Sequence, residues 1–294
     1  MKKLPGIIFA ILSSTAFGFM PIFAKIAYNN GSNAVTLLSF RFLLAAIMLL
    51  VYFYIKKISL NINKKQLYII LLVGLLGYTS TGIVLFLSYN YISVGLATTM
   101  HFIYPAIVIV LNYLVYKEAL TKNKVLALLI SLIGVYVLIG INSNEINLKG
   151  AFLSLFSGFT FAGCVMGINH PELKKLDNSV QVFYFSVCAG TVFLMFSLLM
   201  GQLVLQFNIY TLSSYIGISF VSTIISIVLF IKAVKIIGAS SASILGTFEP
   251  IVSIIMGIIL FNEQLSFTII VGTSLILTSI FILAGENQHT KTEV

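Results

Sequence analysis

Ten apolar runs, each close to the length of a membrane-spanning helix, follow one another along this chain of 294 residues. A helix needs about 20 apolar residues to cross the hydrocarbon core of a bilayer. The runs lie approximately at residues 5–27, 34–55, 67–90, 94–116, 124–141, 150–168, 180–200, 209–231, 240–261 and 265–284. Because helices satisfy their own backbone hydrogen bonds in lipid and isolated strands do not, the runs predict an all-α integral membrane protein with ten transmembrane helices.

The charged residues are few, and they lie mostly between the apolar runs. Only 9% of the residues are charged, against about 25% in soluble proteins, and the net charge is +9. If the N-terminus is cytoplasmic, every lysine except Lys25 and Lys149 falls on the cytoplasmic side. The positive-inside rule then predicts a multi-pass protein of the cytoplasmic membrane with both termini in the cytoplasm. We therefore expect the basic residues to face membrane lipids, and no nucleic acid to be bound.

The two halves of the chain repeat one pattern. Pro105 and Pro250 lie 145 residues apart, and each is followed thirteen positions later by a glutamate, Glu118 or Glu263, that ends an apolar run. Five helices per half is an odd number, so the halves must cross the membrane in opposite directions. The pattern predicts two inverted five-helix repeats, at residues 1–145 and 146–286, and a cytoplasmic tail at 287–294. Inverted repeats are typical of secondary transporters that work by alternating access.

These features together carry a family resemblance. The segment Gly95-Leu-Ala-Thr-Thr-Met-His-Phe-Ile-Tyr-Pro105, the pair Arg41-Phe42 and the segment Phe248-Glu249-Pro250 resemble the EamA family of the drug/metabolite transporter (DMT) superfamily. The resemblance covers nearly the whole chain, as two EamA units. It implies two inverted five-helix bundles around a central cavity and the movement of small organic metabolites, often as amino-acid export. It does not fix the substrate.

Glu249 lies about ten residues from either end of its predicted helix, close to the membrane midplane. An ionised carboxylate is costly at that depth, so acids within the membrane usually face a cavity and bind a partner or a proton. One interpretation makes Glu249 a proton-coupling group or a site for a substrate amino group. The other makes it structural, bonding backbone groups freed by a kink at Pro250. Pro21 and Pro105 are expected to kink their own helices.

Polar residues share one face on each of the two helices that carry Pro105 and Pro250. His101, Tyr104 and Asn112 follow the three-and-four spacing of a single helix face. Glu249 and Ser253 follow the same spacing on the matching helix, where Glu249 occupies the position of Tyr104. We expect the two faces to meet across a central cavity and to contact the substrate.

Arg41 and Tyr78 are the other two predicted substrate-binding residues. Arg41 lies about two helical turns from the outer surface. It either extends its aliphatic stem to place the charge at that surface, or binds a substrate carboxylate with its two-pronged guanidinium. Tyr78 either lines a pocket for an apolar or aromatic solute, or packs in the core or against lipid.

Enzymatic motifs are missing from the sequence. It has no phosphate-binding Gly-Lys-Ser/Thr loop and no His-Glu-x-x-His or cysteine-histidine metal set, so we expect no catalytic residue, cofactor or metal site. We interpret the chain as a secondary transporter that exports or exchanges a small, amino-acid-like metabolite, with proton coupling through Glu249 as an option. The alternatives are an importer of a cationic or quaternary-amine solute, a lipid-carrier flippase and a non-transporting scaffold. Both a monomer and a homodimer stay open.

Overall fold

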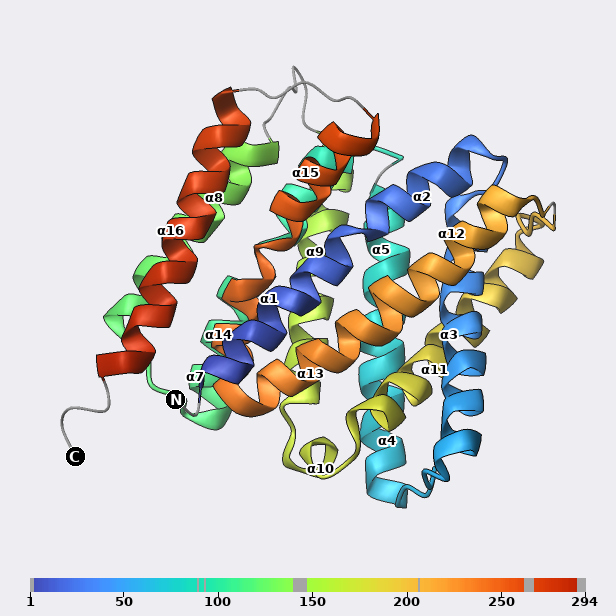
Figure 1. The fold of residues 1–294 in the computed structure, drawn as a ribbon, viewed down its shortest axis with the longest axis horizontal. Helices are drawn as coiled ribbons and strands as arrows, with labels where there is room; N and C mark the ends of the chain where they lie inside the picture. Colours follow the sequence, from blue (N-terminus) through green and yellow to red (C-terminus); the bar gives the residue numbers. More distant parts are fainter. Residues whose placement is uncertain are drawn as a thin grey trace.

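The computed structural model describes residues 3–88, 90–92, 94–139, 147–205, 207–261 and 267–289. Within these residues every regular element is a helix (Figure 1). The elements from the first half of the chain are α1 (Leu4–Gly18), α2 (Met20–Asn29), α3 (Ala34–Lys56), α4 (Lys64–Leu72), η1 (Val73–Thr79), α5 (Ser80–Ser88), α6 (Val94–His101), α7 (Tyr104–Tyr116) and α8 (Lys122–Ile139). Those from the second half are α9 (Leu148–Ile168), α10 (Pro171–Lys174), α11 (Asn178–Leu199), α12 (Ile209–Ser219), η2 (Phe220–Ile225), α13 (Ser226–Ile237), α14 (Ala239–Gly246), α15 (Glu249–Phe261) and α16 (Phe267–His289).

Seven helical stretches of the described chain are long and apolar enough to cross a membrane. They are Leu4–Asn29, Ala34–Lys56, Lys64–Ser88, Leu148–Ile168, Asn178–Leu199, Ile209–Ile237 and Ala239–Leu260. Helices occupy part or all of each of the ten predicted runs. The count of ten crossing helices stays a prediction, and Glu263 and the last residues of the predicted tail lie outside the described part.

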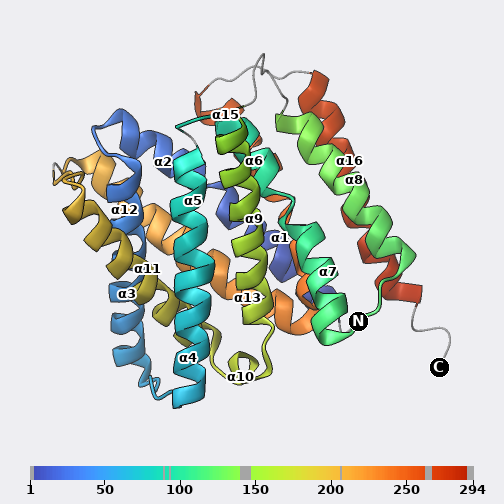
Figure 2. The same ribbon diagram turned by 180° about the vertical axis from the view of Figure 1, so that it is seen from behind.

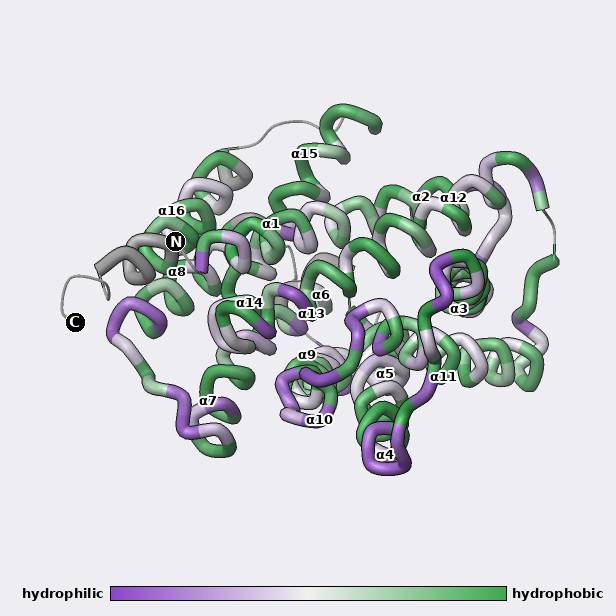
Figure 3. Tube along the Cα trace, turned by 60° about the horizontal axis from the view of Figure 1, so that its bottom comes forward, coloured by the Kyte–Doolittle hydropathy of each residue, from purple (hydrophilic) through white to green (hydrophobic). Residues whose placement is uncertain are grey.

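One end of the helix bundle carries most of its hydrophilic connections. The start of α1, the end of α16 and the short helix α10 all lie there (Figure 1). Figure 3 looks toward this end and shows hydrophilic residues at α4, at α10 and in the connection that follows α7. Lysines begin or end several helices here, namely Lys56, Lys64, Lys122 and Lys174. We call it the lysine-rich end.

Helices of one half pack closely on helices of the other half. Helix α1 packs against α13, α14 and α15, and α9 packs against α5, α6 and α7 (Figures 1 and 2). Helix α3 packs against α11, and α8 against α16. The contacts of α3 with α11 and of α8 with α16 join helices that hold corresponding places in the two halves, and the contacts of α1 correspond to those of α9. The centre of the molecule is therefore lined jointly by both halves.

Three of the long helical stretches are interrupted next to a proline. Helix α1 ends at Gly18 before Pro21, α6 ends at His101 before Pro105, and α14 ends at Gly246 before Pro250. Each proline is the second residue of the helix that follows, where its missing N–H leaves no hydrogen bond unmade. The interruptions free backbone carbonyls near the middle of the bundle.

Two further helical stretches contain a π-helical segment, in which each backbone N–H bonds the carbonyl of the residue five positions earlier. The segment η1 lies between α4 and α5, and η2 lies between α12 and α13. Their first residues, Val73 and Phe220, are 147 positions apart, close to the spacing of the repeat. In each segment a threonine hydroxyl donates a hydrogen bond to a carbonyl of the wider turn. Thr79 donates to Gly74 O, and Thr223 donates to Ile218 O. Such segments are frequent at functional sites.

Candidate functional site

Arg41 of α3 is directed into the bundle, where both halves meet. Only 7% of the residue is exposed. Its Nε donates a hydrogen bond to Thr223 Oγ1 at 2.8 Å, and Nη2 donates one to Ser222 O at 3.2 Å. Its Nη1 lies 2.9 Å from Met20 Sδ, beside the break between α1 and α2. The interpretation that Arg41 extends to the outer surface is wrong, because η2 supplies interior acceptors that hold the guanidinium.

Glu249 begins α15 and faces this arginine. The carboxylate of Glu249 lies within electrostatic reach of the Arg41 guanidinium and of the Tyr104 hydroxyl. Among the described residues, no direct ion pair joins Glu249 to Arg41 and no hydrogen bond reaches its carboxylate. Glu249 is partly exposed rather than fully buried. An acid and a base therefore lie within electrostatic reach of each other at the centre without a direct ion pair between them.

Aromatic rings cover another side of this centre, and they gather around Phe161 of α9. Phe161 meets Tyr104 edge to face at 4.7 Å between ring centroids and lies 5.4 Å from His101. Tyr78 meets the same ring at 6.2 Å. Our sequence analysis missed Phe161, although a signal for it existed. Phe161 lies 144 positions after Phe17, the spacing that also relates Gly6 to Gly150.

Tyr78 of η1 is buried between Phe161 and Phe185, whose ring centroid is 5.4 Å from its own. Its hydroxyl lies beside the Cys164 thiol and within electrostatic reach of Arg41. The Tyr78 hydroxyl makes no hydrogen bond to any described residue. A buried hydroxyl without a partner is unusual in folded proteins, so Tyr78 is available to a further polar group.

The structure brings together five of the seven predicted residues and separates two. Arg41, Glu249, Tyr104, Tyr78 and His101 surround one region, with His101 Nδ1 2.9 Å from Ser157 Oγ.

Asn112 and Ser253 make other contacts. The Ser253 hydroxyl donates to Gly18 O at 3.0 Å and joins α15 to α1. Asn112 lies at the lysine-rich end, where it bonds Glu118 and Ser240. The predicted face of the fourth helix thus does not point into one region along its whole length, since Asn112 lies eight residues, about 12 Å, along α7 from Tyr104.

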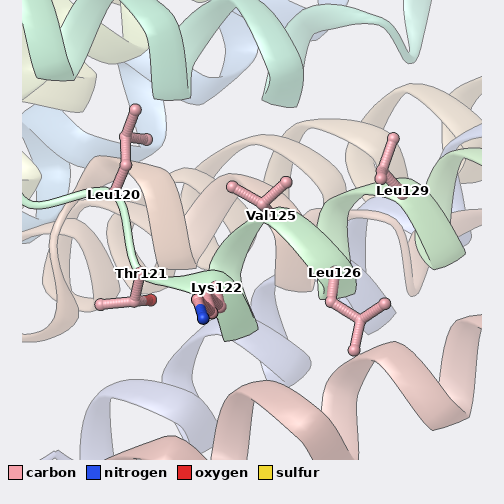
Figure 4. Close-up of a pocket in the computed structure, with 6 residues that line it drawn as sticks. All are labelled: Leu120, Thr121, Lys122, Val125, Leu126 and Leu129. Carbon is pink, nitrogen blue, oxygen red and sulfur yellow. The ribbon is translucent and has the colours of Figure 1, made fainter.

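A surface hollow of about 320 Å³ lies at the start of α8 (Figure 4). It is lined by Leu120, Thr121, Lys122, Val125, Leu126 and Leu129. Its lining is mainly leucine and valine side chains, and none of the predicted site residues takes part. We place the candidate site at the Arg41 and Glu249 cluster, where acidic, basic and aromatic groups converge, and not at this hollow.

Comparison with known proteins agrees with the repeated pattern. The model of the EamA-like transporter family matches residues 4–140 and matches again at residues 148–285. The chain belongs to the EamA-like transporter family. This EamA protein is accordingly a multi-pass membrane transporter rather than an enzyme, with apolar helices long enough to span the bilayer.

The relatives of this EamA transporter are named as transporters without a stated substrate. An uncharacterized transporter of Haemophilus influenzae is 31% identical over 137 residues, which are 46% of this chain and less than half, 44%, of that protein. The uncharacterized transporter YcbK of Bacillus subtilis is 23% identical over 277 residues, covering 91% of this chain and 88% of YcbK. A solved crystal structure has the same fold, with a TM-score of 0.83 at 10% identity over 98% of this chain and 99% of the other.

Proposed function

We propose that this EamA transporter moves a small zwitterionic metabolite, of the amino-acid type, across the cytoplasmic membrane by export or exchange. The observation that carries the proposal is the pairing of Arg41 with Glu249 at the centre of the bundle. A zwitterion presents one carboxylate and one ammonium group, so it complements one base and one acid. The guanidinium suits a carboxylate because it can donate two parallel hydrogen bonds.

The arrangement around each charge supports binding rather than a purely structural role. Three donors of Arg41 are already directed by Thr223, Ser222 and Met20, which fixes the guanidinium before a ligand arrives. Glu249 has no hydrogen-bond partner for its carboxylate among the described residues and is partly exposed. Charges within a membrane are costly unless they serve a pathway or a partner. A substrate ammonium group, or a proton in its absence, would supply that partner.

Alternating access is supported by the repetition of one arrangement of helices in both halves of the chain. The family match occurs twice, at residues 4–140 and 148–285. The contacts of α1 with α13, α14 and α15 correspond to those of α9 with α5, α6 and α7. The π-helical segments recur at corresponding places. We therefore propose two inverted five-helix repeats, ten crossing helices in all, which expose one central site to either side in turn.

The orientation in the membrane follows from the lysines. The lysine-rich end would face the cytoplasm, with both chain ends on that side. Export then means that the substrate reaches Arg41 and Glu249 from the lysine-rich end and leaves at the opposite end. Protonation of Glu249 when the ammonium group departs would couple a proton to the return step.

Import of a purely cationic solute is less well supported by the site. Such a solute would bring a positive charge close to Arg41, for which Glu249 is the one acidic partner among the described residues. Like charges in a medium of low dielectric constant repel strongly. Flipping of a lipid carrier would need no acid and base at the centre, so the charged pair does not favour it.

The test is ligand binding by purified protein, followed as the rise in melting temperature that a ligand of the native state produces. An apolar amino acid is compared with its decarboxylated amine and its deaminated acid. We expect the zwitterion to bind at least about tenfold more tightly than either analogue, and Glu249→Gln to abolish that preference. Glu172→Gln is the control, since it removes a carboxylate at α10 outside the predicted spans. If the amine binds as well as the amino acid, or only lipid carriers bind, the proposal is wrong.

A further inference from the structure

A group of polar side chains joins the two halves at the lysine-rich end, away from Arg41 and Glu249. It comprises Asn112 of α7, Glu118 and Lys124 near the start of α8, and Ser240 of α14. We propose that this group is a latch that holds the lysine-rich end of the transporter closed. The proposal rests on alternating access, the mechanism proposed above.

The latch is a continuous set of hydrogen bonds. Glu118 Oε2 accepts from Asn112 Nδ2 and from the Ser240 hydroxyl, the latter at 3.1 Å. Asn112 Nδ2 also approaches Ser240 Oγ at 2.9 Å, and Lys124 Nζ pairs with Glu118 Oε1 at 2.7 Å. Asn169, the residue that follows α9, donates to Asn112 Oδ1 at 3.3 Å. A carboxylate from one half is thus bonded to a serine of the other, and such charge-assisted bonds are among the stronger ones.

Asn112 and Ser240 of the latch are buried, the Glu118 and Lys124 side chains are partly exposed, and a tightly packed layer lies between the latch and the central site. Asn112 is 0% exposed and Ser240 is 2% exposed. Deeper in the bundle, the Tyr104 hydroxyl donates to Ser243 O at 3.4 Å. A side-chain carbon at Gly246 would meet that hydroxyl at 2.3 Å, so glycine permits the close approach of α7 and α14. Access from the lysine-rich end to the central site therefore requires α7 and α14 to separate.

Gly238 shows how closely the carboxylate is held. It has a φ of +83°, which non-glycine residues rarely adopt, and it turns the chain from α13 into α14. A side-chain carbon there would lie 3.4 Å from Glu118 Oε1. The turn therefore brings the backbone close to Glu118 and presents Ser240 to the same carboxylate.

The described part of the opposite end shows no equivalent set of hydrogen bonds, and Glu263, which corresponds to Glu118, lies outside the described residues. Under the spacing of 145 residues, Asn112 corresponds to Gly257, and Ser240 corresponds to Gly95. Neither glycine can supply a side-chain hydrogen bond. The helices that carry them, α15 and α6, also lack the close packing seen between α7 and α14, as far as the described residues extend. Among the described residues, the Asn112 and Ser240 bonds of the latch thus have no counterpart at the opposite end.

This asymmetry gives the transporter a preferred state. Closing the lysine-rich end makes the Ser240 bonds, and opening it breaks them without forming the corresponding bonds at Gly257 and Gly95, which have no side chain to make them. An interhelical hydrogen bond in a membrane protein shifts an equilibrium about threefold on average. Two such bonds involve Ser240, so removing its hydroxyl should raise the population open at the lysine-rich end about tenfold.

The experiment measures accessibility and needs no substrate. A reporter substitution, Ser243→Cys, places a thiol one turn deeper than Ser240, where the native side chain is 0% exposed. A membrane-impermeant maleimide is applied from the lysine-rich side of oriented vesicles, and label at position 243 is quantified by mass spectrometry. Adding Ser240→Ala should speed labelling about tenfold. Ser241→Ala is the matched control, a neighbouring buried serine for which the structure shows no side-chain hydrogen bond, and should change the rate less than twofold.

Glu118→Gln is a second variant that keeps the size of the side chain and removes its charge. If Ser240→Ala and Glu118→Gln are labelled at the rate of Ser241→Ala while all three keep the parental melting temperature, the latch is refuted. Labelling that is already fast in the reporter alone also refutes it, since the end would not be closed. Zwitterion binding measured on the same variants separates the two proposals. If the parent protein shows no preference for the amino acid, the proposed function is wrong, and the labelling result still tests the latch.

Discussion

Replacing Thr223 by valine tests whether η2 holds Arg41 in its binding orientation. The Thr223 hydroxyl accepts from Arg41 Nε at 2.8 Å and donates to Ile218 O at 3.0 Å. Valine has nearly the same shape and can make neither bond. We expect the helix to persist and the guanidinium to lose its main directing contact.

The size of the effect follows from the burial of the pair. An interhelical hydrogen bond in a membrane contributes about 0.6 kcal/mol on average, and a bond to a charged group in a protein interior about 1.5–3 kcal/mol. Thr223 is 0% exposed and Arg41 is 7% exposed, so water cannot replace the lost acceptor fully. We expect Thr223→Val to lower the free energy of unfolding by about 1–3 kcal/mol and the affinity for the zwitterion about tenfold.

The assay combines reversible unfolding in mixed micelles with calorimetric binding of the amino acid. Thr191→Val is the control, because the Thr191 hydroxyl bonds only Val187 O within its own helix, at 2.7 Å on an exposed face. A double-mutant cycle with Arg41→Met measures the coupling directly, and residues in contact typically show about 0.5–3 kcal/mol.

Two results would refute the reasoning about Thr223. One is a loss of affinity that is the same in Thr223→Val and in Thr191→Val. The other is strict additivity of Thr223→Val and Arg41→Met, since it would mean that the hydroxyl does not act through the arginine.

Two further predictions concern packing and charge away from the central site. Gly77→Ala should lower the melting temperature by several degrees, because the new carbon would lie 2.6 Å from Cys164 Cβ. Gly163→Ala is the control and should leave the melting temperature unchanged, because its new carbon meets nothing within 4 Å. Equal melting temperatures for the two variants would contradict this prediction. At α10, the hydrogen bond from Lys175 holds the pKa of Glu172 below its usual range. The ionised Glu172 therefore stabilises the folded protein at pH values above the usual carboxyl pKa, and this stabilisation is lost as the pH falls through the lowered pKa. Lys175→Met should move the Glu172 pKa upward in an NMR titration, and an unchanged value would show that Lys175 is not the cause.

The positions of the helices could be predicted because lipid leaves the backbone few choices. Apolar runs of about 20 residues must satisfy their hydrogen bonds internally, and this requirement does not depend on the partner helices. Proline acts equally locally, so the breaks near Pro21, Pro105 and Pro250 follow from the missing N–H. The π-helical segments η1 and η2 could not be predicted, because no residue type demands them.

The direction of Arg41 could not be predicted from its depth. A single helix position allows the side chain to extend to the surface or to turn inward, and the acceptors that decide lie 181 and 182 residues away, at Ser222 and Thr223. Asn112 was assigned to the substrate site for a related reason. Its spacing from Tyr104 is correct for one helix face, but its partners include Ser240, which lies 128 residues away. Contacts between the halves decide both cases, and the sequence pattern of one helix contains no information about them.

Each of the two charged residues at the centre, Arg41 and Glu249, has an aromatic residue at the corresponding position in the other half of the chain. At the spacing of 145 residues Glu249 corresponds to Tyr104, and at the spacing of 144 that relates Gly6 to Gly150, Arg41 corresponds to Phe185, which packs against Tyr78. If the repeats had kept identical residues, the centre would hold two acids and two bases, which could neutralise one another directly. With an aromatic ring in place of one of each, a single acid and a single base remain, and neither forms an ion pair with the other in the described structure. In the function proposed above, the substituted positions leave the Arg41 and Glu249 charges for the zwitterion and place rings beside them.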